Sequence, residues 1–166
     1  MRLYEFTSPP KLTWPKTLNI GWWQEQNKLT MYHGTNKANF QLIAENGLTK
    51  KDPNTGMISL AFEPNTAQGY ASMYGGEAQF RAVGAKAVHV PLSDRIVFAF
   101  EIPMDWLKSR MDPKLGGNTP PEKAKLLNKE LYEKFDKSDI EYYALTEIRV
   151  NTEVPSSFII GYMTKV

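Results

Sequence analysis

The sequence predicts a single domain of the α+β class, and three observations support this prediction. The chain has 166 residues, of which 42% are hydrophobic, and this suffices for one sizeable core. Segments with apolar residues at helical spacing alternate with short runs rich in β-branched and aromatic residues. These strand-like runs dominate the second half of the chain, an order that is typical of mixed folds.

The first predicted elements are a strand and a helix separated by a short polar turn. Leu29 to His33 has the composition of a strand, and Asn36 is a typical N-cap for the helix that follows. Phe40 and Ile43 repeat at helical spacing. Gly47 suits a left-handed helix stop, so the helix is expected to end there.

A second strand and helix follow a polar loop at residues 49–56. Residues 58–62 form a short apolar run that predicts a buried strand, and Pro64 stands where a helix can begin. Tyr70 and Tyr74 lie one turn apart on this helix, and Gly75-Gly76 is expected to end it.

The first 28 residues are rich in proline and tryptophan. They are expected to form an arm that packs on the core, or alternatively a platform for a ligand, and residues 29–166 form the main domain. The further elements expected along the chain are a loop or weak helix at 77–86, strands at 87–90 and 95–102, a loop at 111–121, an amphipathic helix from 120 to about 136, and strands at 141–150 and 158–163.

Composition excludes some classes of protein. There is no cysteine, so disulfides and thiolate metal sites are excluded, and two histidines are too few for a histidine-rich zinc site. The net charge of +2 argues neither for nor against nucleic acid. Residues 1–6 lack the apolar region of a secretory signal, and no apolar run approaches the ~18 residues of a membrane span. We expect a soluble, cytoplasmic monomer without a metal and without a membrane partner.

Three polar residues that are far apart in the sequence could act together: His33, Tyr70 and Glu147. Cleavage of the bond between nicotinamide and ribose develops positive charge on the ribose. A histidine can hold a ribose hydroxyl, a tyrosine ring can stack on cationic nicotinamide, and a carboxylate stabilises the cationic transition state. Each residue also has a structural alternative, in a turn, in the core and on a solvated strand respectively.

The motifs around these residues resemble those of ADP-ribosyltransferases. His33-Gly34-Thr35 and its helix resemble the first motif of the diphtheria-toxin and poly(ADP-ribose) polymerase branch, which has a His-Tyr-Glu triad. Residues 58–71 resemble the second motif, a strand that leads into the helix with the stacking tyrosine. Residues 146–150, Thr-Glu-Ile-Arg-Val, resemble the third. The likeness extends in the correct order over residues 29–162.

The resemblance implies a compact split β-sandwich with flanking helices and an enzyme that uses NAD as its substrate. It implies that Glu147, His33 and Tyr70 are catalytic. It implies contacts to NAD from His33, Gly34, Thr35, Ser59, Tyr70 and Tyr74. The expected reaction is a single transfer of ADP-ribose to a macromolecular acceptor, with a protein favoured over a nucleic acid.

Two departures from the family pattern leave alternatives open. Ser59 stands where many members have a second tyrosine, and Ala67 stands where a serine often contacts the carboxamide. An inactive binding or structural module with the same fold is therefore one alternative. An RNA 2′-phosphotransferase that uses NAD is another, although such enzymes rely on added arginines. Residues 1–6 also resemble the starts of small phage proteins, which would place the protein in a host cytoplasm.

Overall fold

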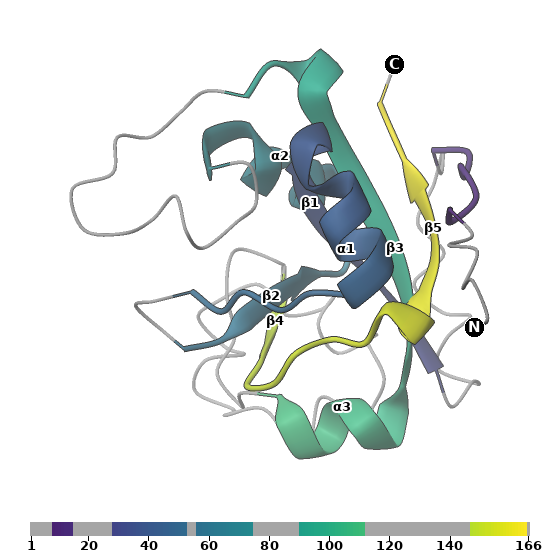
Figure 1. The fold of residues 1–166 in the computed structure, drawn as a ribbon. Helices are drawn as coiled ribbons and strands as arrows, with labels where there is room; N and C mark the ends of the chain where they lie inside the picture. The colour runs from purple at the N-terminus through teal and green to yellow at the C-terminus, as the bar shows by residue number, and fades with distance from the viewer. Residues whose placement is uncertain (1–7, 15–27, 53–55, 75–89, 112–146, 166) are drawn as a thin grey trace, which may run out of the picture.

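The computed structural model of the protein describes residues 8–14, 28–52, 56–74, 90–111 and 147–165. These residues have mixed α+β structure, built on a five-stranded antiparallel sheet with strand order β4-β2-β1-β3-β5 (Figure 1). The strands are β1 (Lys28–Asn36), β2 (Ile58–Ala61), β3 (Arg95–Pro103), β4 (Glu147–Val150) and β5 (Ile159–Met163). The helices are α1 (Phe40–Asn46), α2 (Pro64–Tyr74) and α3 (Met104–Arg110), with short 3-10 turns at 37–39, 92–94 and 156–158. The predicted α+β class is confirmed.

Neighbouring strands of the sheet are paired over unequal lengths. β1 and β3 pair along nine positions, whereas the register between β1 and β2 is one pair, Tyr32 with Ala61. Ala61 pairs in turn with Glu147 on β4. In Figure 1, β2 and β4 run at an angle to the long paired strands β1 and β3. The sheet is therefore narrowly connected at Tyr32 and Ala61.

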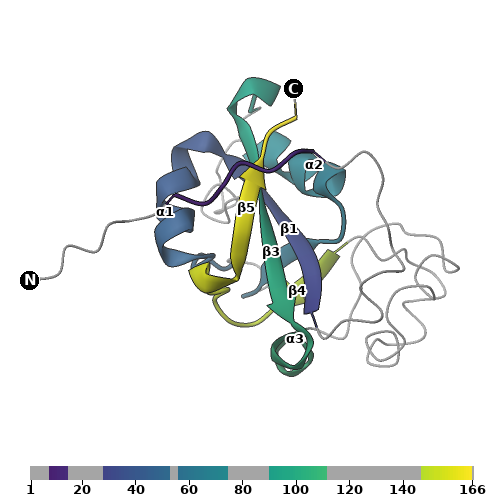
Figure 2. The ribbon, with the colours of Figure 1, turned by 90° about the vertical axis from the view of Figure 1, so that its right-hand side faces the viewer.

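Helices α1 and α2 lie on opposite sides of the strands β1, β3 and β5 (Figure 2). The larger apolar cluster lies on the α1 side, where Phe40 stacks on Phe98 with ring centroids 5.5 Å apart and Ile43 is buried. A smaller cluster on the other side contains Ala67 of α2 and Val97 of β3. Since successive strand residues face opposite sides, the alternating apolar residues of β3 supply both clusters.

The predicted stop of α1 at Gly47 is confirmed, whereas the helix itself begins at Phe40, after the 3-10 turn at 37–39. The Asn36 side chain accepts a hydrogen bond of 3.0 Å from the amide of Ala38 and so caps the 3-10 turn that leads into α1. Gly47 has a φ of 74° and its amide donates to the Ile43 carbonyl at 2.7 Å. A Cβ at Gly47 would clash with the carbonyl oxygen of Val154, so both the backbone conformation and the packing require glycine.

Other predicted elements agree in position and differ in length. The expected strand at 29–33 is part of the longer β1, and those at 58–62, 95–102 and 158–163 correspond to β2, β3 and β5. Helix α2 begins at the expected Pro64. Residues 147–150 of the expected strand at 141–150 form β4. The remaining predictions lie outside the described residues: the end of the second helix at Gly75-Gly76, the loop at 77–86, most of the strand at 87–90, nearly all of the loop at 111–121, the helix at 120–136 and residues 141–146.

The seven-residue helix α3 is not predicted from the sequence. Pro103 ends β3 and precedes the helix, and Met104 and Leu107 are buried at a spacing of three residues. Trp106 packs edge-on against Phe158, with ring centroids 5.3 Å apart. A helix of two turns is too short to show a hydrophobic period, so these contacts with distant residues stabilise it.

Residues 8–14, which belong to the predicted N-terminal arm, lie along β5. The Leu12 amide donates to the Tyr162 carbonyl at 2.7 Å, and the Tyr162 amide donates to the Pro10 carbonyl at 3.0 Å. The ammonium of Lys165 lies 5.9 Å from the ring centroid of Trp14. The segment therefore covers the backbone groups at the outer edge of β5.

Candidate functional site

His33 lies on β1 beside its narrow connection to β2. Its Nδ1 lies 3.2 Å from the carbonyl oxygen of Ser59 on β2. A carbonyl oxygen only accepts, so Nδ1 carries the proton and donates. The ring thus bridges the two strands one residue beyond Tyr32, where the backbone register ends. This hydrogen bond fixes the orientation of the imidazole and, in the neutral ring, its tautomer.

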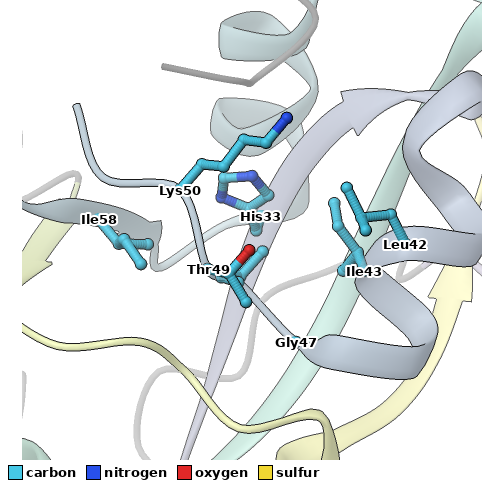
Figure 3. Close-up of a pocket in the computed structure, with 8 residues that line it drawn as sticks. His33, Leu42, Ile43, Gly47, Thr49, Lys50 and Ile58 are labelled. Atoms are coloured by element: carbon cyan, nitrogen blue, oxygen red, sulfur yellow. The ribbon is translucent and has the colours of Figure 1, made fainter. Parts of the chain in front are cut away.

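A small pocket opens beside the imidazole (Figure 3). Its lining comes from β1, from α1 and the segment after it, and from the start of β2: His33, Leu42, Ile43, Gly47, Leu48, Thr49, Lys50 and Ile58. Most of these side chains are apolar, and Lys50 adds a positive charge. The enclosed space is about 10 Å³, which is room for one water molecule. Tyr70 and Glu147 are not among the lining residues.

Glu147 is the first residue of β4, and it is buried, with 7% of its surface exposed. It is therefore not the solvated strand residue considered as its alternative role. Its Oε1 lies 3.1 Å from a terminal nitrogen of Arg149 in an ion pair. The two residues are two positions apart on one strand, so both side chains emerge on the same face of the sheet, as the spacing predicts.

Gly34 is the point at which α2 crosses β1. A Cβ on Gly34 would clash with the carbonyl oxygen of Ala67. The glycine thus has a packing reason that is independent of any ligand. Tyr70 follows Ala67 by three residues on α2, at the border of the buried face, and is 36% exposed. Its ring is therefore accessible from solvent, unlike that of a core tyrosine.

The other residues expected to contact NAD differ in accessibility. Thr35 is fully buried, and its hydroxyl accepts a 3.0 Å hydrogen bond from the Asn39 side chain, which suits a local structural role. Ser59 is half-buried and supplies the carbonyl that holds His33. Tyr74 is the last described residue of α2, and its side chain lies outside what the structure describes.

The structure brings the three motifs together in the backbone but does not bring the three side chains into one described pocket. Ala61 pairs with both Tyr32 and Glu147, so β1 and β4 lie on either side of β2, about 10 Å apart. Strand alternation directs the Cβ of His33 to the α1 face and those of Ala61 and Glu147 to the α2 face. The imidazole lies between β1 and β2, because it bonds to the Ser59 carbonyl.

Tyr32 precedes His33 and shares the α2 face with Ala61. It is 9% exposed and packs in the smaller apolar cluster. Burial raises the pKa of the Tyr32 phenol, because the charged phenolate loses its hydration. Tyr32 therefore stays neutral at physiological pH.

Sequence reasoning gave no site role to Arg149 or to the Ser59 carbonyl. The pairing of Arg149 with Glu147 follows from a spacing of two residues in one strand, so alternation alone could have found it. The Ser59 carbonyl could not have been found in this way, because the register between β1 and β2 depends on the whole sheet.

No protein-family model matches the chain, and a search of the curated proteins finds no match. Within the described ranges, no group of three or more histidine, aspartate or glutamate side chains is placed to hold a metal ion. No helix in the same part of the chain is long and apolar enough to cross a membrane.

Proposed function

We propose that the protein is a mono-ADP-ribosyltransferase that uses NAD as its substrate and modifies a macromolecular acceptor, with a protein favoured over a nucleic acid. We propose equally that the narrow connection between β1 and β2 is the split of an ADP-ribosyltransferase-type sheet. The resemblance of the three sequence motifs suggests this function, and the geometry at that connection supports it.

The observation that carries the proposal is the hydrogen bond between His33 and the Ser59 carbonyl. It attaches the imidazole of the first motif to β2, and β2 pairs on its other side with the strand that bears Glu147. The helix that bears Tyr70 crosses β1 at Gly34, the next residue after His33. Three segments that are distant in sequence therefore meet at one junction, as a dinucleotide site requires.

In the proposed arrangement NAD lies across this junction. Lys50, beside His33 on the α1 face, supplies a positive charge for the phosphates of the dinucleotide. The nicotinamide half reaches the α2 face, where Tyr70 stacks on its ring and Glu147 hydrogen-bonds the ribose. The two halves of the ligand thus meet groups on the two faces of the sheet.

The reaction breaks the bond between the ribose C1′ and the nicotinamide nitrogen. Nicotinamide leaves with the bonding electron pair and becomes neutral, and C1′ gains oxocarbenium character, which the Glu147 carboxylate stabilises. A nucleophilic atom of the acceptor attacks C1′ from the opposite side and gives up its proton to solvent. The products are ADP-ribosylated acceptor with inverted C1′, nicotinamide and a proton.

Glu147→Gln tests the proposal, with Glu101→Gln as a matched control on the exposed surface of β3, where Glu101 pairs with Lys28 at 3.0 Å. The protein is incubated with labelled NAD and a cell lysate, and nicotinamide release and label on macromolecules are measured. We expect the wild type and Glu101→Gln to turn over equally. Glu147→Gln should lose on the order of 100-fold or more in turnover, because the carboxylate acts mainly in the transition state.

Binding is followed separately by thermal unfolding. NAD at 100 times its dissociation constant should stabilise wild type and Glu147→Gln by about 2.7 kcal/mol. Label on nucleic acid would show that the acceptor is a nucleic acid and not a protein. Loss of a 2′-phosphate from RNA would favour a phosphotransferase. If the protein neither turns over NAD nor is stabilised by it, an inactive module would be favoured and the proposal would be overturned.

A further inference from the structure

The ion pair between Arg149 and Glu147 gives Arg149 a specific task, which rests on the proposed function. The side chain of Glu147 is 9% exposed, whereas that of Arg149 is 38% exposed. A carboxylate that is nearly removed from water is costly unless a positive charge and hydrogen bonds compensate for the lost hydration. Arg149 provides a charge-assisted hydrogen bond of 3.1 Å to Oε1.

The geometry also restricts how the carboxylate can turn. Both side chains emerge on one face of a strand that is paired with β2 at each of its four residues. Arg149 itself pairs with Ser59, the residue whose carbonyl holds His33. The guanidinium donates a hydrogen bond to Oε1, so a rotation of the carboxylate away from this orientation would cost that bond.

We propose that Arg149 is a positioning residue: it holds Oε1 of Glu147 from the solvent side, so that Oε2 is presented to the nicotinamide ribose. Arg149 is not itself a catalytic residue, since it acts through Glu147. The alternative task for an arginine at such a site is to bind a phosphate of NAD or of the acceptor. The two tasks differ in the kinetic constant that they affect.

Arg149→Met keeps an unbranched apolar stem of similar reach and removes the charge and the donors. If Arg149 positions Glu147, kcat should fall about 10- to 100-fold, because misplacement of a reacting group by about 1 Å is costly, and the KM for NAD should stay within about threefold. Arg149→Lys restores the charge without the planar donors, so part of kcat should return. Lys28→Met breaks the 3.0 Å ion pair between Lys28, the first residue of β1, and Glu101 on β3, and it should change neither constant.

A double-mutant cycle with Glu147→Gln isolates the dependence on Glu147. If Arg149 acts only through the carboxylate, Arg149→Met should cost nothing further in the Glu147→Gln background. Thermal unfolding of every variant, with and without NAD, is measured in parallel. A folded Arg149→Met that still gains stability from NAD while kcat is reduced would separate positioning from general loss of structure.

Three outcomes would overturn the role of Arg149. One is an unchanged kcat in Arg149→Met. Another is a raised KM with kcat retained, which would instead make Arg149 a phosphate-binding residue. The third is a full additional loss in the Glu147→Gln background. In all three the wild type still releases nicotinamide, so the proposed function survives. A wild type that neither binds nor cleaves NAD would overturn both.

Discussion

His33 illustrates how a single contact can define a candidate site. An imidazole at the end of a strand has several ordinary structural roles, and the residue alone does not distinguish them. The 3.2 Å hydrogen bond to the Ser59 carbonyl sets the ring between two strands and assigns the proton to Nδ1. A ligand that approaches His33 therefore meets a ring whose orientation is already set.

Tyr70 is predicted to contribute to binding rather than to the chemical step. Its ring is partly exposed on α2, so removal of the ring should affect NAD more than it affects folding. Tyr70→Ala should weaken NAD affinity about 2- to 30-fold, the range expected for stacking of a cation on an aromatic face. Tyr70→Phe, which keeps the ring, should bind as the wild type does. Isothermal titration would measure both, and equal affinities of Tyr70→Ala and wild type would remove the ring from the NAD site.

Tyr32 is predicted to limit stability in alkali. Burial raises the pKa of its phenol in the folded protein, so the unfolded chain loses this proton at a lower pH than the folded one. The contribution to stability is complete below about pH 10, the ordinary pKa of tyrosine, and declines as the pH rises above it. Tyr32→Phe should therefore show a shallower alkaline decline in urea unfolding between about pH 8 and about pH 11. Parallel curves for the two proteins would contradict this expectation.

Helix α2 depends on how closely it approaches β1. Ala67 and Ala71 are small and fully buried, and Gly34 provides the space into which the Ala67 carbonyl fits. The same approach sets the position of Tyr70 relative to the junction. Gly34, a residue of the predicted binding motif, is thus also required for the packing of a helix on a strand.

Two glycines make a matched test of this packing. Gly34→Ala puts a Cβ against the Ala67 backbone and should destabilise the fold by about 1–3 kcal/mol, with weaker NAD binding because α2 must shift. Gly69 lies within α2, and a Cβ there meets nothing within 4 Å. Gly69→Ala should stabilise the protein by about 0.5–1 kcal/mol through helix propensity. Urea unfolding measures both, and a Gly34→Ala variant as stable as the wild type would refute the close crossing.

At the scale of the whole molecule, the part of the sheet that the structure describes has a long three-stranded half, β1, β3 and β5, and a short half, β2 and β4, joined at Tyr32 and Ala61. Each half is anchored at its outer edge by a segment from elsewhere. Residues 8–14 lie on β5, and Met111 forms a bridge with Val150 of β4. The narrow junction at Tyr32 and Ala61 therefore lies between two halves whose outer edges are each paired with another segment.

Removal of the segment on β5 should weaken the long half. Deletion of residues 1–14 exposes the outer backbone groups of β5, and an uncovered strand edge favours association with other chains. We expect a lower unfolding midpoint and more self-association by light scattering. Gly161→Val should have a smaller effect in the same direction, because its Cβ would lie 2.6 Å from the Pro10 carbonyl oxygen and displace the segment. A monodisperse truncated protein with an unchanged midpoint would show that the segment does not protect this edge.

Much of the fold could be predicted from short stretches of the sequence. The cap at Asn36, the stop at Gly47 and the start at Pro64 depend on side-chain chemistry within a few residues, and all three agree with the structure. Helix α3 could not be predicted, because Trp106 is stabilised by a ring that lies 52 positions further along the chain, Phe158. For the site, the shared face of Glu147 and Arg149 followed from strand alternation.

Local residue chemistry was therefore sufficient for the type of each confirmed element and for the choice of three candidate residues. The tertiary structure alone decided that Glu147 is buried, that Gly34 accommodates a helix and that His33 attaches β1 to β2. The physical reason is the range of the interactions. Capping and alternation act over a few residues, whereas strand register and helix crossing depend on contacts between segments that the sequence places far apart.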